Sequence, residues 1–291
     1  MSFSANHIVF ACLLAEGLVI ATLVLVPRLL RLCFGVKSAG PTAWQERVEL
    51  RYQNQGTYVW IFALSKLRLD PMFRELPEFL RDLPSPRMAM DLGCGHGFAG
   101  CSLLEWFPGL KLFGIEPSAS RVRAAARAFG QRGRVFQAAA PDFESPMLPD
   151  RMDAAFALDM IHFLSDPALD LTLKRIRARL DDGAYLFLRA PMHPEGRGSF
   201  LWNLDKITRA LSGASAYFRS DDQIRCAIEK AGFQIMRVQM SGDNQELFWF
   251  IAAASSPKSV IERDGAEQKH DDNVNHDERE QVPVAEFIPP L

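Results

Sequence analysis

The chain has 291 residues, of which 48% are apolar, 10% aromatic and 23% charged, and its formal net charge is −2. This length allows one large domain or two modest ones, and this composition excludes a disulfide-stapled miniprotein, a wholly disordered chain and a membrane protein of many spans. The near-neutral charge gives no reason to expect a nucleic acid as partner, and the scattered five cysteines and six histidines predict neither a disulfide framework nor a metal site.

The first unusual segment is the apolar stretch Ile8 to Val26, whose 19 residues would span about 28 Å as a helix, close to the hydrocarbon thickness of a bilayer. Its single acid, Glu16, reduces the gain on insertion but leaves it favourable. Basic residues are absent before the stretch and follow it at Arg28, Arg31 and Lys37, which places the downstream chain in the cytoplasm, in a bacterium at the inner membrane. We expect a membrane anchor. The alternatives are an amphipathic helix on the membrane or docked on the domain, and a cleaved signal peptide.

Residues 36–86, which follow the predicted anchor region 1–35, show the spacing of helices. Aromatic and aliphatic residues alternate with charged ones, and the pattern is interrupted at Gly56. It restarts at Asp70, a typical N-cap, followed by Pro71 at the first helical position. These helices are too few to form a core alone. We therefore interpret them as a helical lid that packs on the next domain.

From Arg87 onward, short apolar runs alternate with helical segments. The seven runs read RMAMDL, KLFGIE, RVFQA, DAAFAL, AYLFLRA, FQIMRVQM and ELFWFIAAA. This alternation predicts an α/β domain over residues 87–254, with a mostly parallel, Rossmann-like sheet of seven strands covered on both faces. Only about five residues separate the last two runs, too few for a helical crossover, so these strands should be antiparallel neighbours. Residues 255–291 carry nine acidic and four basic residues, which predicts a disordered acidic tail.

A glycine-rich turn follows the first predicted strand, where MDLGCGHG places Asp91 at the strand end and Gly93, Gly95 and Gly97 after it. Glycines at this point let the chain turn sharply and let a ligand approach the backbone closely. Glu116 lies 19 residues beyond Gly97, at the end of the second strand, where a carboxylate can accept hydrogen bonds from both ribose hydroxyls. The pair predicts a pocket for an adenosine-containing cofactor.

Two such cofactors fit this geometry. The segment GHGFAG satisfies the GxGxxG pattern of nicotinamide cofactors, so an NAD(P)-dependent oxidoreductase is one alternative. The glycines, however, begin two positions earlier, at Gly93, and Asp91 would repel a pyrophosphate while it suits an ammonium and a sulfonium. S-adenosylmethionine is therefore the favoured cofactor. A catalytically silent membrane scaffold is a further alternative, against which the intact Asp91, Gly93 and Glu116 argue.

With these motifs, DAAFALDMIHFL on the fourth strand and RLDDGAYLFLRAP leading into the fifth, the chain resembles class I S-adenosylmethionine-dependent methyltransferases. The resemblance implies a seven-stranded sheet whose last strand is reversed. It also implies that the glycine turn surrounds the methionyl part, that Glu116 binds the ribose and that Asp159 lies beside the methionyl group. The further positions that it assigns to the cofactor are Asp91, Gly93, Cys94, Gly95, Gly97, Pro117 and Met160.

One departure concerns the adenine. Many relatives carry a glycine-aspartate pair after the third strand, where this chain has three alanines, residues 138–140, and only then Pro141 and Asp142. The backbone at Ala140 and the side chain of Asp142 are the two candidates. The region YQNQGTYVWIFALSKLRLDPMF is similar to methyltransferases of aryl-polyene pigment biosynthesis, which implies an aromatic lipid head group as acceptor.

Methyl transfer needs orientation and, for an oxygen nucleophile, a base. His162 follows the fourth strand and is the candidate for that base; its alternative role is packing or a hydrogen bond on the cofactor side. The segment 192–219 mixes apolar and basic residues, which is typical of a cover over the active site that touches lipid, or of a packed surface loop. We therefore expect a membrane-tethered methyltransferase for a lipophilic acceptor such as an aromatic polyene, a quinone or a lipid head group.

Overall fold

The structure is a computed structural model, and it describes residues 43–192, 216–242 and 247–255. Within these ranges, no helix combines the length and the apolar character that crossing a bilayer requires. Three predicted features lie outside the described residues: the anchor at residues 8–26, the acidic tail after Ser255, and residues 193–215 of the insert.

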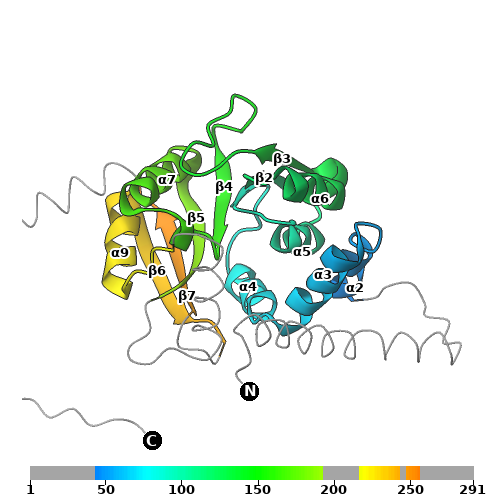
Figure 1. Cartoon of the computed structure of the whole chain (residues 1–291). Coiled ribbons are helices and arrows are strands. Elements are labelled where there is room, and N and C mark those ends of the chain that lie inside the picture. Colours follow the sequence, from blue (N-terminus) through cyan, green and yellow to red (C-terminus); the bar gives the residue numbers. More distant parts are fainter. Residues whose placement is uncertain (1–42, 193–215, 243–246, 256–291) are drawn as a thin grey trace, which may run out of the picture.

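A seven-stranded sheet in the order β3-β2-β1-β4-β5-β7-β6 forms the centre of the molecule (Figure 1). The strands are β1 Met88–Leu92, β2 Lys111–Glu116, β3 Gly133–Gln137, β4 Met152–Leu158, β5 Leu180–Pro191, β6 Phe233–Met240 and β7 Leu247–Ala254. Strands β1 to β5 pair in parallel, whereas β7 runs antiparallel to both of its neighbours, β5 and β6. The seven strands and the reversal of the last one are confirmed.

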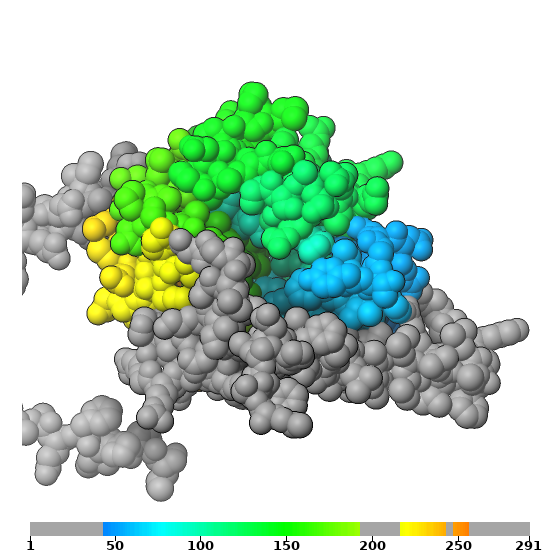
Figure 2. Space-filling model, viewed as in Figure 1, coloured from blue at the N-terminus to red at the C-terminus, as the bar shows by residue number. Residues whose placement is uncertain are grey.

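Helices cover both faces of the sheet (Figure 1). They are α2 Trp44–Leu50, α3 Thr57–Leu69, α4 Met72–Arg81, α5 Phe98–Trp106, α6 Ala119–Phe129, α7 Asp166–Ala178 and α9 Asp221–Lys230. Successive side chains of a strand point to opposite faces, so Met90 joins the core beneath α7 and α9, while Ala89 joins the core beneath α2 to α6. In the space-filling view, the yellow-green surface of α7 and α9 is separated by a recess from the surface of α6 and the N-terminal helices (Figure 2).

The N-terminal helices are attached to the sheet by packing and by hydrogen bonds. The predicted breaks at Gly56 and Asp70 are confirmed, although α4 begins at Met72, one residue later than expected. The carboxylate of Asp70 accepts a hydrogen bond from the Met72 amide at 3.0 Å, as a capping side chain does. Farther along α4, Glu75 accepts a hydrogen bond from the indole Nε1 of Trp249 on β7 at 2.7 Å. Helix α4 is thereby fixed to β7, the strand next to one edge of the sheet.

Candidate active site

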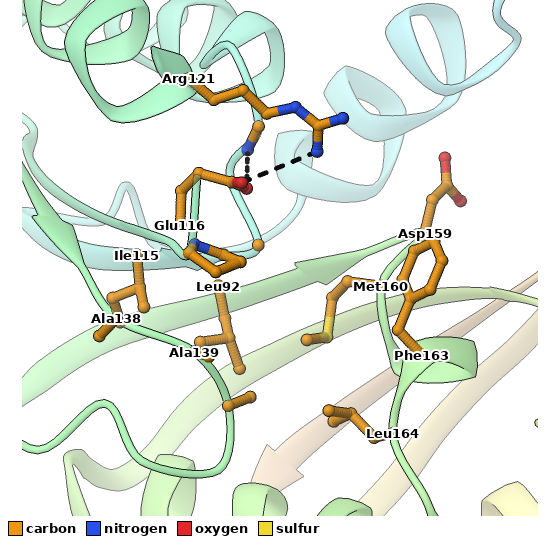
Figure 3. Close-up of a pocket in the computed structure, with 14 residues that line it drawn as sticks. Leu92, Ile115, Glu116, Arg121, Ala138, Ala139, Asp159, Met160, Phe163 and Leu164 are labelled. Carbon is orange, nitrogen blue, oxygen red and sulfur yellow. Dashed lines mark hydrogen bonds and ion pairs between the residues drawn. The ribbon is translucent and has the colours of Figure 1, made fainter. Parts of the chain in front are cut away.

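A cavity of about 430 Å³ opens at the carboxyl ends of β1, β2 and β4, where ligands bind in open α/β sheets. Figure 3 shows Glu116 and Arg121 on one side of this cavity and Asp159 and Phe163 on the other. The cavity brings together seven of the residues predicted to bind the cofactor: Gly93, Gly95, Glu116, Pro117, Ala140, Asp159 and Met160. Asp91, Cys94, Gly97 and Asp142 are not among the residues that line it.

Two positions of the glycine turn, Gly95 and Gly97, have a positive φ that residues with side chains rarely adopt, but the space around them differs. Gly97 has a φ of 85° and begins α5, and a Cβ there would lie 2.7 Å from the ring of Phe129. Gly95 has a φ of 57°, and a Cβ there would meet no atom within 4 Å. Gly97 therefore closes the turn against α6, and Gly95 presents bare backbone to the cavity.

Glu116 ends β2 with its side chain buried, only 3% of the residue being exposed. Its Oε2 accepts a hydrogen bond from the Gly95 amide at 3.1 Å, and its Oε1 accepts one from the Ser118 amide at 3.0 Å. Arg121 on α6 lies 3.7 Å from the same Oε1. A carboxylate has about four acceptor positions, so Glu116 is held in place and can still accept hydrogen bonds from a ribose.

Asp91 lies at the same end of β1 and is 2% exposed. Burial, together with the nearby charge of Glu116, raises the pKa of Asp91 to about 7. Its Oδ2 is buried and accepts no hydrogen bond from the described residues. Beside it, burial raises the pKa of the Cys94 thiol well above its usual range, so this side chain stays protonated and apolar. Asp91 is thus an acid that an approaching ammonium would stabilise in its charged form.

Asp159 follows β4 and has a φ of 55°, a backbone conformation that residues other than glycine rarely adopt. Its Oδ2 lies 3.2 Å from the guanidinium Nη1 of Arg189, while its Oδ1 is buried and accepts no hydrogen bond from the described residues. Burial raises the pKa of Asp159, and the nearby Arg189 only partly offsets this effect. The strained backbone and the open Oδ1 together mark a position shaped for a ligand.

The two candidates for the adenine differ in where they lie. Ala138, Ala139 and Ala140 line the cavity after β3. The side chain of Asp142 is 83% exposed and forms an ion pair with Arg175 at 2.7 Å. The apolar strip at residues 138–140 is therefore the surface that a flat adenine ring would contact, and Asp142 interacts with α7 instead.

His162 lies in a short 3-10 turn, η2 Ile161–Phe163, and is 3% exposed. Its ring packs against Phe163, with 4.1 Å between ring centroids, and it is not among the residues that line the cavity. In the glycine turn, the ring of His96 stacks on Phe98 with 5.6 Å between centroids. Both histidines thus take part in aromatic packing beside the site.

Sequence reasoning missed several residues of the cavity wall. Arg121 was not among the predicted site residues, although it lies within ion-pair distance of Glu116 and lines the cavity. Phe163 was not singled out, although its side chain forms part of the wall. Arg121 lies five residues beyond Glu116, which would place it over the strand end, and this spacing was the signal that could have identified it.

The residues present fit S-adenosylmethionine. Two buried carboxylate oxygens without hydrogen-bond partners in the described chain, on Asp91 and Asp159, suit its cationic end. The bare backbone at Gly95 and the firmly held Glu116 suit the ribose. Asp91, Glu116 and Asp159 would thus hold the cofactor at its methionyl and ribose parts, with the alanines of residues 138–140 beneath its base.

Comparison with known proteins agrees with this assignment. Residues 90–186 match a protein family described as a methyltransferase domain. Among solved structures, the chain is similar to the pyocyanin biosynthetic protein PhzM, with 17% identity over 79% of this chain and 68% of that chain and a TM-score of 0.52. It is similar to a putative O-methyltransferase from Nostoc punctiforme, with 15% identity over 80% of this chain and 69% of that chain and a TM-score of 0.52.

A third similar structure is CalO1, a methyltransferase in calicheamicin biosynthesis determined with S-adenosylhomocysteine bound, with 17% identity and a TM-score of 0.50. That match covers 68% of this chain and 56% of CalO1, so this chain spans little more than half the length of CalO1. No curated protein matches the chain. At these identities the similarity to solved structures shows a shared fold. The match of residues 90–186, the sheet with its reversed last strand and the fit of the cavity show a methyltransferase domain with the class I fold, and they support S-adenosylmethionine as its cofactor.

Proposed function

We propose that the enzyme methylates a lipophilic small molecule, such as an aromatic polyene, a quinone or a lipid head group. The observation that carries this proposal is the position of Phe163. Its side chain lines the cavity near Asp159 and Met160, yet 52% of the residue is exposed. A large aromatic side chain that forms a cavity wall and also faces outward suits an apolar, preferably aromatic, acceptor.

The names of the similar structures favour the same class of acceptor. PhzM is described as a pyocyanin biosynthetic protein, CalO1 as a methyltransferase in calicheamicin biosynthesis, and a third structure, with 19% identity and a TM-score of 0.50, as a mitomycin 7-O-methyltransferase. These names describe enzymes of natural-product biosynthesis. They support a small organic molecule as acceptor and leave the nucleophilic atom open.

The chemistry asks little of the protein beyond orientation. The bound cofactor supplies a methyl group on a sulfonium, whose sulfur is already a good leaving group. The acceptor atom forms a bond to the methyl carbon as the carbon–sulfur bond breaks, and an oxygen acceptor also loses its proton. Holding the two reactants in line supplies much of the rate enhancement. In this chain, Asp159 and Glu116 would fix the donor from opposite walls, and Phe163 would bound the space left for the acceptor.

The role of His162 as a base is a separate proposal that stays a prediction. A base must come within hydrogen-bond reach of the proton that it removes. His162 is buried in η2 and its neighbours Phe163 and Leu164 line the cavity, so this role requires the turn to move toward the cavity. A His162→Gln variant that lowers turnover without weakening cofactor binding supports the base, and unchanged turnover contradicts it.

The acceptor class can be tested with S-adenosylmethionine that carries a deuterated methyl group. The full chain is incubated with a whole-cell extract that contains lipids, water-soluble metabolites, protein and nucleic acid, and the labelled products in each fraction are compared by mass spectrometry with those of the Glu116→Ala variant. We expect the label in an apolar small molecule with the unchanged chain only. Label confined to water-soluble metabolites, protein or nucleic acid, or absent from every fraction, would refute the proposal.

We also propose that residues 8–26 attach the enzyme to a membrane, with the catalytic domain on the cytoplasmic side. The support is the apolar sequence of this stretch and the basic residues that follow it. Fractionation of cells that express the chain with and without residues 1–35 tests the proposal. Recovery of the full chain from the membrane pellet and of the shortened chain from the supernatant supports it, and a full chain in the supernatant contradicts it.

A further inference from the structure

The carboxylate of Asp159 is held from one side only. Its amide donates a hydrogen bond to the carbonyl of Arg189 at 2.8 Å, which extends the ladder between β4 and β5 by one residue beyond β4. Its Oδ2 is paired with the Arg189 side chain at 3.2 Å, and its Oδ1 is left buried at the cavity. Both the backbone and the side chain of Asp159 therefore depend on a single residue of β5.

Arg189 is a fully buried arginine, 1% exposed, that bridges two acids. Its Nη1 lies 3.2 Å from Asp159 and its Nη2 lies 2.9 Å from Asp70, and its guanidinium carbon lies 5.7 Å from the centre of the Trp249 ring. The planar guanidinium presents several donors in a fixed geometry, so one arginine can hold two carboxylates at a defined separation. A buried cation requires such partners, because it has lost its hydration. Asp159 and Asp70 are thus positioned relative to each other through Arg189.

Asp70 lies at the junction of α3 and α4 and does not line the cavity. Besides Arg189, it binds the Met72 amide, which starts α4, and the ammonium of Lys66 at 2.9 Å on α3. Burial alone would raise the pKa of Asp70, but Arg189 and Lys66 outweigh it and lower the value to about 2, so Asp70 is charged at all physiological pH values. The N-terminal helices therefore reach the cavity through a chain of charged contacts.

We propose that Arg189 is a positioning residue that couples the α3–α4 junction, through Asp70, to Asp159, so that the open Oδ1 of Asp159 faces the ammonium group of the cofactor. The inference rests on the proposed place of Asp159 at the methionyl end. We call the contacts Asp70–Arg189–Asp159 the bridge. A substitution at Asp70 or at Arg189 should move Asp159 and weaken binding of that ammonium. The adenosine part binds at the opposite wall and should be unaffected.

Two ligands separate these effects. S-adenosylhomocysteine carries the ammonium, whereas methylthioadenosine has the adenosine part but lacks the amino-acid end. We measure the Kd of both by calorimetry on the full chain and on Arg189→Met, Arg189→Lys and Asp70→Asn. We expect Arg189→Met to bind S-adenosylhomocysteine roughly 10-fold more weakly, the size of one lost charge-assisted hydrogen bond, and methylthioadenosine unchanged. Arg189→Lys, which keeps the charge but lacks the fork, should lie between Arg189→Met and the unchanged chain.

Asp70→Asn is the sharper variant because residue 70 does not line the cavity. It should reproduce part of the loss of affinity for S-adenosylhomocysteine. This loss should disappear when Asp159→Asn is already present, because the bridge then has no acid to position.

The matched control is Arg177→Met. Arg177 is a largely buried arginine that donates to the carbonyls of Leu180 and Gly232, at the opposite end of β5, and its loss should alter neither affinity.

The outcomes separate the possibilities. Equal weakening of both ligands would mean that the bridge only maintains the fold, and unchanged affinity for both would mean that Asp159 is positioned without it; either result overturns the proposal. If Arg189→Met does not fold, Asp70→Asn with and without Asp159→Asn still decides the question. Failure of the unchanged chain to bind either ligand would instead contradict the cofactor site itself.

Discussion

The two walls of the cavity each present a carboxylate, Glu116 on one and Asp159 on the other, but they hold it differently. Glu116 accepts hydrogen bonds from two nearby backbone amides, that of Gly95 in the glycine turn and that of Ser118 two residues farther along the chain. The exposed Arg121 lies next to it. Asp159 is fixed by the side chain of one buried arginine that also binds the N-terminal helices. The Glu116 wall is therefore a local construction of one strand–turn–helix unit, and the Asp159 wall depends on contacts from distant parts of the chain.

The largest expected effect concerns Asp91, a buried acid that does not itself line the cavity and lies on β1, beside the strand that carries Glu116. The pKa of Asp91 is raised from 3.8 to about 7 by burial and by Glu116, so the folded protein holds this proton more tightly than the unfolded chain. Stability should then fall as the pH rises from about 4 to 7, because the unfolded chain loses the proton first. Each pKa unit corresponds to about 1.4 kcal/mol, so the penalty at pH 8 is of the order of 4 kcal/mol.

Asp91→Asn removes this penalty. Without ligand, the variant should be more stable than the unchanged chain at pH 8, and this difference should shrink by more than half at pH 5, as measured by urea unfolding at the two pH values. If the Asp91→Asn variant is less stable than the unchanged chain at both pH values, the contrast between Asp91 and Glu116 is wrong. In that case Asp91 would be held by favourable contacts, as Glu116 is.

Glu116→Ala should have the next largest effect, on binding. It removes the carboxylate that would accept hydrogen bonds from the ribose, and two charge-assisted bonds correspond to a loss of about 100-fold in affinity. Calorimetry should show this loss for S-adenosylhomocysteine and for methylthioadenosine alike, since both carry the ribose. An unchanged affinity for either ligand would place the ribose elsewhere, and binding of NAD by the unchanged chain would point to a different cofactor.

The difference between the walls also explains what could be predicted from the sequence. The glycine turn and Glu116 lie on one unit, β1 to β2, whose spacing is visible in the sequence, and the strands were predicted because apolar runs and short connections are local features. The role of Arg189 could not be predicted. The sequence pattern places this arginine within an apolar strand, but it does not show that the side chain contacts Asp70 and Asp159. Phe163 was missed for the same reason, since only the folded chain shows that it lines the cavity.

Asp159→Asn should have a smaller and more selective effect than Glu116→Ala. The amide keeps the shape of the side chain but loses the charge that would attract the ammonium, so S-adenosylhomocysteine should bind about 10-fold more weakly. Methylthioadenosine should bind as before, because it lacks the ammonium. This contrast sharpens the comparison, since the same two ligands would report ribose contacts on one wall and amino-acid contacts on the other. Equal weakening of both ligands by Asp159→Asn would contradict it.

The smallest effect is expected for Arg121→Ala. Arg121 and Arg189 each lie next to a cavity carboxylate, but the Arg121 side chain is 54% exposed and that of Arg189 is 1% exposed. An exposed ion pair contributes about 0 to 1 kcal/mol, and salt screens it. Loss of Arg121 should therefore weaken S-adenosylhomocysteine binding by less than about 5-fold, and the difference should vanish at high salt.

Arg123→Ala is the control for this prediction, because Arg123 is exposed on the same helix and does not line the cavity. Both variants are measured by calorimetry at low and at high salt, beside Arg189→Met. A loss for Arg121→Ala that exceeds that for Arg189→Met and persists at high salt would reverse the assignment of the two walls. Glu116 would then be the carboxylate that depends on its arginine, and the two backbone amides at Gly95 and Ser118 would be insufficient to hold it.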